Sequence, residues 1–245
     1  MTTRRMFITG TDTGVGKTHF TVWLARQLAA AGYRVGAYKP VCSGAIVTQG
    51  RETWDDAERL ASALGNAWPI ERIAPQCFRE PLAPPVAAAL ECREVDEQLL
   101  IAGADWWNDR VDILLVEGAG GWMSPVSRHW TNGDLAHRLK SPVILVAGNR
   151  LGVINHSLLS ISAIRQKCDL AGIVLNELAP SDTGLPSGFD PVQSNREEIE
   201  RRSGIRMWGV LSHGDRPDLM DNGVPISTDL ADLLAREDER GPSAP

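Results

Sequence analysis

The feature that most constrains this 245-residue chain is a glycine-rich segment at residues 10–18, Gly-Thr-Asp-Thr-Gly-Val-Gly-Lys-Thr. It follows a short apolar run at 5–9 and precedes a pattern over 18–31 in which apolar residues recur at helical spacing. A phosphate-binding loop needs this order of strand, loop and helix, because the loop amides and the helix N-terminus both face the phosphates. The segment therefore predicts an α/β fold that binds a nucleoside triphosphate.

The residue types in this segment each have a role in phosphate binding. Gly14 and Gly16 let the backbone approach the phosphate oxygens, Lys17 can reach the terminal phosphates, and the hydroxyl of Thr18 can ligate magnesium. The usual phosphate loop has a glycine at the position of Thr11, whereas the glycine here comes one residue earlier, so this loop is one residue longer. The alternative is a glycine-rich turn that binds nothing, and the Gly-Lys-Thr ending disfavours it.

Strands and helices alternate along the rest of the chain. The segments 111–116 and 142–147 are nearly continuous apolar runs, which is typical of strands buried on both faces of a parallel sheet. Further elements are predicted as strands at 34–38, 171–175 and 207–211 and as helices at 57–64, 94–104, 155–167 and 195–203. The alternation favours right-handed crossovers and an α/β fold with a doubly wound, mostly parallel sheet flanked by helices, as in P-loop nucleoside triphosphatases.

Two segments interrupt that alternation. Residues 66–93 are rich in proline, and residues 178–194 are rich in Pro, Gly, Ser and Asp, so we expect both to be long surface loops. The length of the chain suits one domain over 1–235, and the charged, proline-containing tail at 236–245 is expected to fray.

Charge and composition narrow the choice of partners. The net charge is -6, without the excess of Lys and Arg typical of nucleic-acid binders, so we expect no nucleic-acid partner. No apolar stretch approaches the roughly 20 residues of a membrane span, and residues 1–10 lack a signal-peptide pattern, so we expect no membrane association and a cytoplasmic location. The four cysteines contain no C-x-x-C pair, which predicts free thiols that pack as small buried side chains.

Charged residues follow two of the predicted strands. Glu117 ends the strand at 111–116 and precedes Gly-Ala-Gly-Gly-Trp, and Lys39 ends the strand at 34–38. The carboxyl ends of parallel strands form the ligand-binding rim of such sheets, where Glu117 can hold magnesium and Lys39 can stabilise a phosphoryl group in transfer. The alternative is that both side chains are merely solvated.

Other polar residues also have two interpretations. Asp55 and Asp56 open a predicted helix, where carboxylates stabilise the helix N-terminus or, for one of the two, ligate a metal. Asn176 ends the strand at 171–175, and its amide suits either a turn or the edge of a nucleotide base. The five histidines show no metal-ligand spacing and no Gly-x-Ser-x-Gly segment occurs, so metal hydrolases and serine hydrolases lack their key residues here.

Four motifs together resemble the dethiobiotin synthetase family, whose members close the ureido ring in biotin synthesis. They are the segment at 10–18, Tyr-Lys-Pro-Val at 38–41 with Ser43-Gly44, Val-Glu-Gly-Ala-Gly-Gly-Trp at 116–122, and Leu-Gly-Val-Ile-Asn-His at 151–156. The motifs span most of the chain and are specific in combination. The first alone is shared with related ATPases that partition chromosomes or amidate cobyrinic acid.

The resemblance implies an ATP-dependent cyclo-ligase. Its substrates would be 7,8-diaminononanoate, carbon dioxide and ATP, and its products dethiobiotin, ADP and phosphate, by way of a carbamate and its phosphorylated anhydride. Phosphoryl transfer needs positioning and charge neutralisation more than a nucleophile from the protein, which agrees with the lack of a nucleophile motif. The resemblance also implies magnesium as the cofactor and a homodimer as the assembly.

The same resemblance assigns roles to residues of this sequence. Lys39 beside the carbamate and Lys17 on the phosphates are expected to be catalytic. The expected magnesium ligands are Thr18, Asp56 and Glu117. The expected substrate contacts are Ser43, Leu151, Gly152 and Asn155, the last three facing a two-fold partner. The expected ATP contacts are Thr13, Gly14, Val15, Gly16, Lys17, Thr18, His19, Asp56, Glu117, Gly118, Ala119, Gly120, Asn176, Glu177, Leu211, Ser212 and His213.

Some positions depart from the family pattern, and two other functions compete with it. Ala83-Pro84-Pro85 stands where Ser-Pro-His is common, Arg150 where Lys is usual, and Leu211-Ser212 where Ile-Pro is common. A nucleotide-dependent switch of the partitioning type usually carries another lysine early in its loop, and residues 10–12 contain none. An amidoligase of the cobyrinic type needs a glutamine amidotransferase domain, for which 245 residues leave no room.

Overall fold

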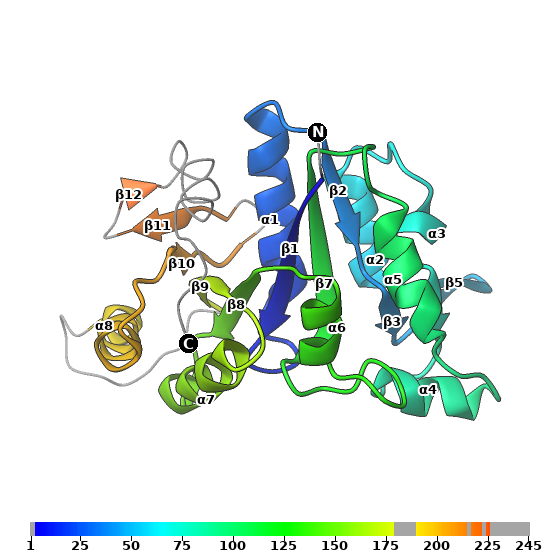
Figure 1. Ribbon diagram of the computed structural model, residues 1–245. Coiled ribbons are helices and arrows are strands. Elements are labelled where there is room, and N and C mark those ends of the chain that lie inside the picture. The colour runs from blue at the N-terminus through cyan, green and yellow to red at the C-terminus, as the bar shows by residue number, and fades with distance from the viewer. Residues whose placement is uncertain (1–2, 179–189, 215–216, 222–223, 226–245) are drawn as a thin grey trace.

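An eight-stranded sheet forms the centre of the computed structural model, which describes residues 3–178, 190–214, 217–221 and 224–225 (Figure 1). The strand order is β12-β11-β10-β9-β8-β1-β7-β2. The strands are β1 (Arg4–Gly10), β2 (Val35–Tyr38), β7 (Ile113–Gly121), β8 (Val143–Gly148), β9 (Leu170–Asn176), β10 (Gly209–Leu211), β11 (Leu219–Asp221) and β12 (Val224–Pro225). Each pair from β2 to β10 is parallel, and β11 and β12 add antiparallel pairs at one edge. The predicted doubly wound, mostly parallel sheet is confirmed, and only its antiparallel edge was not predicted.

Helices connect the strands and cover the sheet. They are α1 (Lys17–Ala30), α2 (Asp55–Ala63), α3 (Ile70–Ile73), α4 (Pro84–Leu90), α5 (Glu97–Asp105), α6 (Asn132–Arg138), α7 (Val153–Arg165) and α8 (Pro191–Ser203). Two small sheets pair β3 (Val41–Ser43) with β6 (Gln76–Phe78) and β4 (Ile46–Thr48) with β5 (Arg51–Thr53). Within the described ranges, no helix is long and apolar enough to cross a membrane.

The prediction of a long surface loop at 66–93 is wrong, because that segment contains α3, β6 and α4. Pro84 is the first residue of α4, a position where the missing backbone N–H costs little, and β6 forms by pairing with the distant β3. The second expected loop, 178–194, ends early because α8 begins at Pro191, and its residues 179–189 lie outside the described residues. The tail predicted at 236–245 and the end of the domain predicted over 1–235 also lie outside them.

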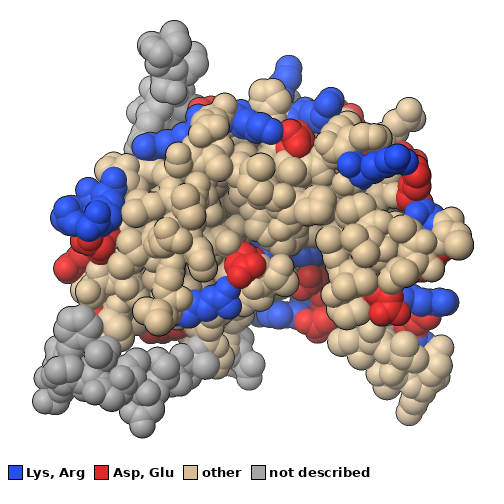
Figure 2. All heavy atoms as spheres, turned by 90° about the horizontal axis from the view of Figure 1, so that it is seen from below, with Lys and Arg blue, Asp and Glu red and all other residues tan. Residues whose placement is uncertain are grey.

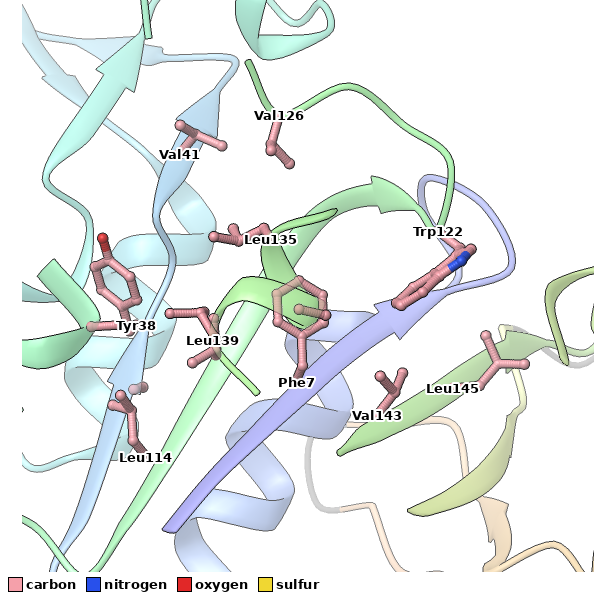
Figure 3. Close-up of a cluster of buried hydrophobic side chains, with 14 of the residues drawn as sticks. Phe7, Tyr38, Val41, Leu114, Trp122, Val126, Leu135, Leu139, Val143 and Leu145 are labelled. Carbon is pink, nitrogen blue, oxygen red and sulfur yellow. The ribbon is translucent and has the colours of Figure 1, made fainter. Parts of the chain in front are cut away.

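Both faces of the sheet are buried. On β1, the side chain of Phe7 belongs to the core on one face, and those of Met6 and Ile8 belong to the core on the other, as strand alternation requires. The Met6 face packs against α1, and the Phe7 face packs against side chains that include those of α5, α6, α7 and α8. Figure 3 shows Phe7 among labelled side chains from β2, β8 and the α6 region. This double burial explains why the runs at 111–116 and 142–147 are continuously apolar.

The carboxyl ends of the parallel strands lie at one end of the sheet, the lower end in Figure 1. The loop after β1 turns there into α1. Figure 2 views the molecule from this end and shows basic and acidic side chains next to one another in a hollow of the surface. Open α/β sheets bind their ligands at this edge, so the hollow is where a ligand is expected.

Candidate active site

The loop between β1 and α1 has a shape that favours glycine at two positions. Gly14 and Gly16 have φ angles of 71° and 92°, in the left-handed region. A Cβ added at Gly16 would lie 2.0 Å from Nδ2 of Asn176. That Nδ2 donates a 3.0 Å hydrogen bond to the carbonyl oxygen of Val15. The end of β9 therefore fixes the shape of the loop, and a side chain at Gly16 would break this contact.

Four charged or hydroxyl side chains from separate elements meet beside the loop. Oγ1 of Thr18 lies 2.6 Å from Oδ1 of Asp56 and 2.7 Å from Oε1 of Glu117. Nζ of Lys39 lies 2.6 Å from Oε1 of Glu117 and 2.7 Å from Oδ2 of Asp56. Glu117 is inaccessible to solvent and Lys39 is 4% exposed. The structure thus brings together α1, α2, the residue after β2 and the middle of β7 around one buried cluster. The prediction that Glu117 ends its strand is wrong, because β7 continues to Gly121, which pairs with Gly10 of β1.

The charges of this cluster stabilise one another. Burial disfavours the charged form of Lys39, but Glu117 and Asp56 outweigh burial and raise the pKa of Lys39 well above its usual value. Burial also opposes ionisation of Asp56, yet Lys39 holds the pKa of Asp56 below its usual value. At neutral pH the site therefore contains a charged lysine fixed beside an ionised aspartate.

Lys17 is placed next to this cluster but is held differently. Burial, followed by repulsion from Lys39, lowers the pKa of Lys17 to about 8, against the attraction of Glu117 and other carboxylates. Its Nζ donates a 3.2 Å hydrogen bond to the carbonyl oxygen of Asp12. An anion bound inside the loop would therefore face two ammonium groups, those of Lys17 and Lys39.

A cavity of about 340 Å³ opens between the loop, α2 and the end of β7. The predicted site residues that line it are Thr13, Gly14, Gly16, Lys17, Thr18, His19, Lys39, Ser43, Asp56, Ala119 and Gly120. Val41 and Arg59 also line it, and neither was predicted. Arg59 follows Asp56 at the i, i+3 spacing of one helix face, which is the signal that could have identified it. Its ion pair with Asp55 spans 3.7 Å between exposed side chains, so it holds Arg59 only weakly.

Two predicted residues support the cavity from behind instead of lining it. Val15 is buried and packs against Gly148. Gly118 leaves room for Asn132, since an added Cβ would lie 2.4 Å from Oδ1 of that side chain. Asn132 accepts a hydrogen bond from the amide of Ala119 over 3.1 Å and donates to the carbonyl oxygens of residues 119 and 121 over 2.7 Å each. This buried amide, which the sequence did not reveal, therefore fixes the backbone after Glu117.

The oxygen atoms of the cluster form a donor set for a hard divalent cation. Oε2 of Glu117 is buried and has no hydrogen-bond partner among the described residues. It belongs to the same cluster as the hydroxyl of Thr18 and the carboxylate of Asp56. Such a set suits a cation that prefers oxygen ligands. No group of three or more His, Cys, Asp or Glu suited to a metal occurs in the described part of the chain.

The predicted ATP contacts at 176–177 and 211–213 do not converge on one cavity. Glu177 and Ser212 line a second cavity of about 490 Å³, whose walls come mainly from α8, β10 and β11. Leu211 is buried in the core, and its carbonyl oxygen accepts a 3.0 Å hydrogen bond from the amide of Glu177. His213 is exposed. Asn176 is buried, and its Oδ1 has no hydrogen-bond partner among the residues that the structure describes.

Three further predicted substrate contacts lie at 151–155, far from Ser43 in the sequence. Leu151 is fully exposed, Asn155 is exposed, and Gly152, with φ 94°, precedes the first turn of α7. None of these three lines the 340 Å³ cavity. Nη2 of Arg150 lies 2.6 Å from Oδ2 of Asp12, which ties this segment to the phosphate loop.

Curated proteins with similar sequences share one description. A family profile described as an AAA domain matches residues 4–219. The ATP-dependent dethiobiotin synthetase of Anaeromyxobacter dehalogenans (strain 2CP-C) is 42% identical over 81% of this chain and 85% of its own length. The protein of the same description from Rhodopirellula baltica is 37% identical over 96% of this chain and 94% of its own length. The one from Serratia marcescens is 39% identical over 93% and 98%.

Solved structures resemble the chain in fold. The structure of pNOB8 ParA bound to nonspecific DNA matches with a TM-score of 0.53 and 12% identity, over 98% of this chain and 100% of that one. The signal recognition particle 54 kDa protein of Aeropyrum pernix, in complex with GDP, matches with a TM-score of 0.52 and 16% identity, over 97% of this chain and 47% of that one. At such identities the likeness concerns the arrangement of strands and helices alone.

Proposed function

The chain belongs to the family of ATP-dependent dethiobiotin synthetases, and we propose that the cluster of Lys39, Glu117, Asp56 and Thr18 is where it performs that ligase reaction. The reaction converts 7,8-diaminononanoate, carbon dioxide and ATP into dethiobiotin, ADP and phosphate. The observation that carries the proposal is the buried Lys39, held charged beside the phosphate loop by two carboxyl groups.

Three steps make up the reaction. One substrate amine adds to carbon dioxide and loses a proton, giving a carbamate. A carbamate oxygen then attacks the γ-phosphorus and ADP leaves. The second amine attacks the carbonyl carbon of this anhydride, releases phosphate and closes the ring. Each step places negative charge on oxygen atoms, so the protein contributes fixed positive charges and orientation rather than a nucleophile.

The position of each residue in the cavity indicates its task in the reaction. Loop amides and Lys17 face the triphosphate from one side of the cavity. Lys39 lines the same cavity, where its ammonium group stabilises charge on the carbamate and on the γ-phosphoryl group in transfer. Ser43 lines the wall beyond Lys39 and is assigned to the diamine.

Magnesium is the cation we assign to the oxygen cluster. Its ligands would be Thr18, Asp56 and Glu117, and the unpartnered buried Oε2 of Glu117 supports this fit. When bound, the ion neutralises phosphate charge. The protein's own part is to keep Asp56 ionised and both carboxyl groups oriented, which Lys39 does through its two short ion pairs.

The nucleotide base is assigned to the end of β9. Asn176 is fixed through its Nδ2, which leaves the buried Oδ1 as an acceptor suited to an exocyclic amino group. Glu177, Ser212 and the neighbouring residues 211 and 213 are assigned to the same end of the nucleotide.

A homodimer is part of this proposal. Leu151, two residues before α7, and Leu159, in the middle of α7, expose apolar side chains, which suits burial against a second subunit. Residues 151, 152 and 155 of one subunit would then complete the diamine site of the other. The particle mass in solution tests this assembly. We also place the enzyme in the cytoplasm, since its four cysteines are free thiols, as is usual in a reducing compartment.

The direct test is a reaction with ATP, magnesium, bicarbonate and 7,8-diaminononanoate, followed by mass spectrometry of dethiobiotin. We expect product formation that requires all four components. A preparation that binds ATP yet forms no dethiobiotin would contradict the proposal. The partitioning-type switch is disfavoured because the ParA likeness, at 12% identity, extends to the fold alone. ATP turnover independent of the diamine would favour it.

ATP binding should weaken as pH rises above about 8, the pKa of Lys17 in the nucleotide-free protein. Below that pH Lys17 is charged and attracts phosphate, and above it the neutral amine must take up a proton before it can do so. Calorimetric titration with ATP in two buffers of different ionisation enthalpy should therefore show proton uptake near pH 8.5 and little near pH 7. Equal affinity and no proton uptake from pH 7 to 9 would contradict this assignment.

Replacing Arg59 by alanine should raise the KM for ATP about threefold to tenfold and change kcat little, because a half-exposed guanidinium contributes modest attraction to phosphate. Arg51→Ala is the matched control, since Arg51 is 79% exposed, belongs to β5 and does not line the cavity. Steady-state kinetics of both variants test the role. An equal effect of the two substitutions would mean that Arg59 contributes only general charge.

A further inference from the structure

Two cysteines face each other across a small parallel sheet beside the cavity. Cys42 in β3 is directly opposite Cys77 in β6 in the strand register. Residues opposite one another in register project from the same face of a sheet, and neighbouring strands lie about 4.8 Å apart. That spacing falls within the roughly 4.4–6.8 Å between Cα atoms that a disulfide spans. All four cysteines of the chain are free thiols.

The two thiols differ in environment. Cys42 is 2% exposed, whereas Cys77 is half-buried. Cys77 donates a 3.5 Å hydrogen bond from its thiol to the carbonyl oxygen of Ala74. Interaction with the Cys42 thiol lowers the pKa of Cys77, with further help from Arg93, although burial opposes it. The same interaction, together with burial, raises the pKa of Cys42. Cys77 is therefore the nucleophile of the pair, and Cys42 is the second thiol, which can form a disulfide with it.

The pair is connected to the active site through β3. Cys42 lies between Val41 and Ser43, which both line the 340 Å³ cavity, and the strand begins two residues after Lys39. The connection also extends to α2, because Cys42 packs with Ala57, the neighbour of Asp56. A change in the spacing of β3 and β6 would therefore move residues on two walls of the cavity.

We propose that Cys77 and Cys42 form a peroxide-sensitive pair whose oxidation to a disulfide reversibly inactivates the enzyme. The Cys77 thiolate attacks one oxygen of a hydroperoxide, the O–O bond breaks, and hydroxide or alkoxide leaves as Cys77 becomes a sulfenic acid. The Cys42 sulfur then attacks the Cys77 sulfur, the S–O bond breaks, and water leaves with the proton from Cys42. The peroxide is reduced by two electrons, and the two thiols are oxidised to one disulfide.

Inactivation follows from the geometry of the bond. Two sulfurs in a disulfide are about 2.05 Å apart, much closer than two thiols in contact, so both cysteine side chains must turn towards each other. This turn changes the packing of Cys42 against Ala57 and, through β3, the positions of Val41 and Ser43 at the cavity. Reduction of the disulfide by a thiol restores the original packing, which suits reversible control. The effect on turnover rests on the proposed function, whereas formation of the bond does not.

The test treats the full-length protein with hydrogen peroxide and maps its peptides by mass spectrometry, with turnover measured on the same samples. We expect a peptide pair joined through Cys42 and Cys77, loss of most dethiobiotin formation, and recovery of both with dithiothreitol. Cys77→Ser should keep its turnover in peroxide. The matched control Cys92→Ser should remain sensitive, because Cys92 is exposed and belongs to no such pair in the register.

Each alternative result has a definite meaning. No joined peptide, or equal inactivation of Cys77→Ser and the unmodified protein, would overturn the proposal. A joined peptide without loss of turnover would overturn the regulatory part. If the protein forms no dethiobiotin before oxidation, the proposed function fails, and the peptide map still decides whether the pair closes. Cys168 is an internal reference within each sample, since burial raises the pKa of its thiol to about 11.

Discussion

Replacing Lys39 by alanine is expected to reduce kcat on the order of 100-fold to 1,000-fold, the loss seen when a preorganised charge is removed from a reacting oxygen. The KM for ATP should change less, because Lys17 and the loop amides continue to bind the triphosphate. Steady-state kinetics measure both values. Near-normal turnover in a folded variant would remove Lys39 from the mechanism.

The structure adds a second expected effect of the same substitution. Lys39 is 4% exposed and forms ion pairs with Glu117 and Asp56, so alanine leaves the buried Glu117 without its partner. Breaking a buried pair in this way costs about 3–5 kcal/mol of unfolding free energy. Thermal unfolding should therefore be measured beside turnover. The double variant Lys39→Met with Glu117→Gln removes both charges, so it should recover stability but not turnover, which separates folding from catalysis.

Replacing Glu117 by glutamine should reduce turnover by about 100-fold or more and raise the magnesium concentration needed for half-maximal rate. Glutamine keeps the size of the side chain but removes the negative charge, and its amide cannot supply two carboxylate oxygens at the position of Oε1 and Oε2. A magnesium titration of the rate measures the second effect. The magnesium dependence separates loss of a metal ligand from loss of the ion pair with Lys39, which remains present.

Glu58→Gln is the matched control, because it makes the same chemical change on α2, at a residue whose side chain is 43% exposed and pairs only loosely with Arg51, over 3.8 Å. Its turnover and magnesium dependence should stay close to those of the unmodified enzyme. If Glu117→Gln shows the same magnesium dependence as this control, Glu117 is a structural partner of Lys39 and not a metal ligand.

Most residues that the sequence placed at the loop do lie together in the structure. The order of strand, glycine-rich loop and helix is local in the chain, and Lys17 and Thr18 follow the loop directly. Lys39 directly follows β2, and Glu117 is the central residue of the neighbouring β7, whose register places Val116 beside Tyr38. Their meeting was expected because the carboxyl ends of parallel strands share one edge, although the 2.6 Å contact between them was not.

Contacts that depend on how helices rotate and where loops return were not predictable. Arg59 reaches the cavity because α2 turns that face towards α1, and Asn132 fixes residues 119–121 because α6 begins beneath them. The predicted ATP contacts near residue 211 lie at the end of a short strand, β10, whose side chains alternate between buried and partly exposed. In each case the direction of one side chain is set by packing against segments far away in the sequence.

The sequence by itself determined the α/β class, the phosphate loop and the residues at the strand ends, because short-range patterns specify these features. The tertiary structure alone decided that Lys39 bridges two carboxyl groups. It also showed that the segment 66–93 contains α3, β6 and α4, and that Cys42 faces Cys77. These features arise from pairing between distant segments, whose free energy comes from burial and register and leaves no local pattern in the sequence.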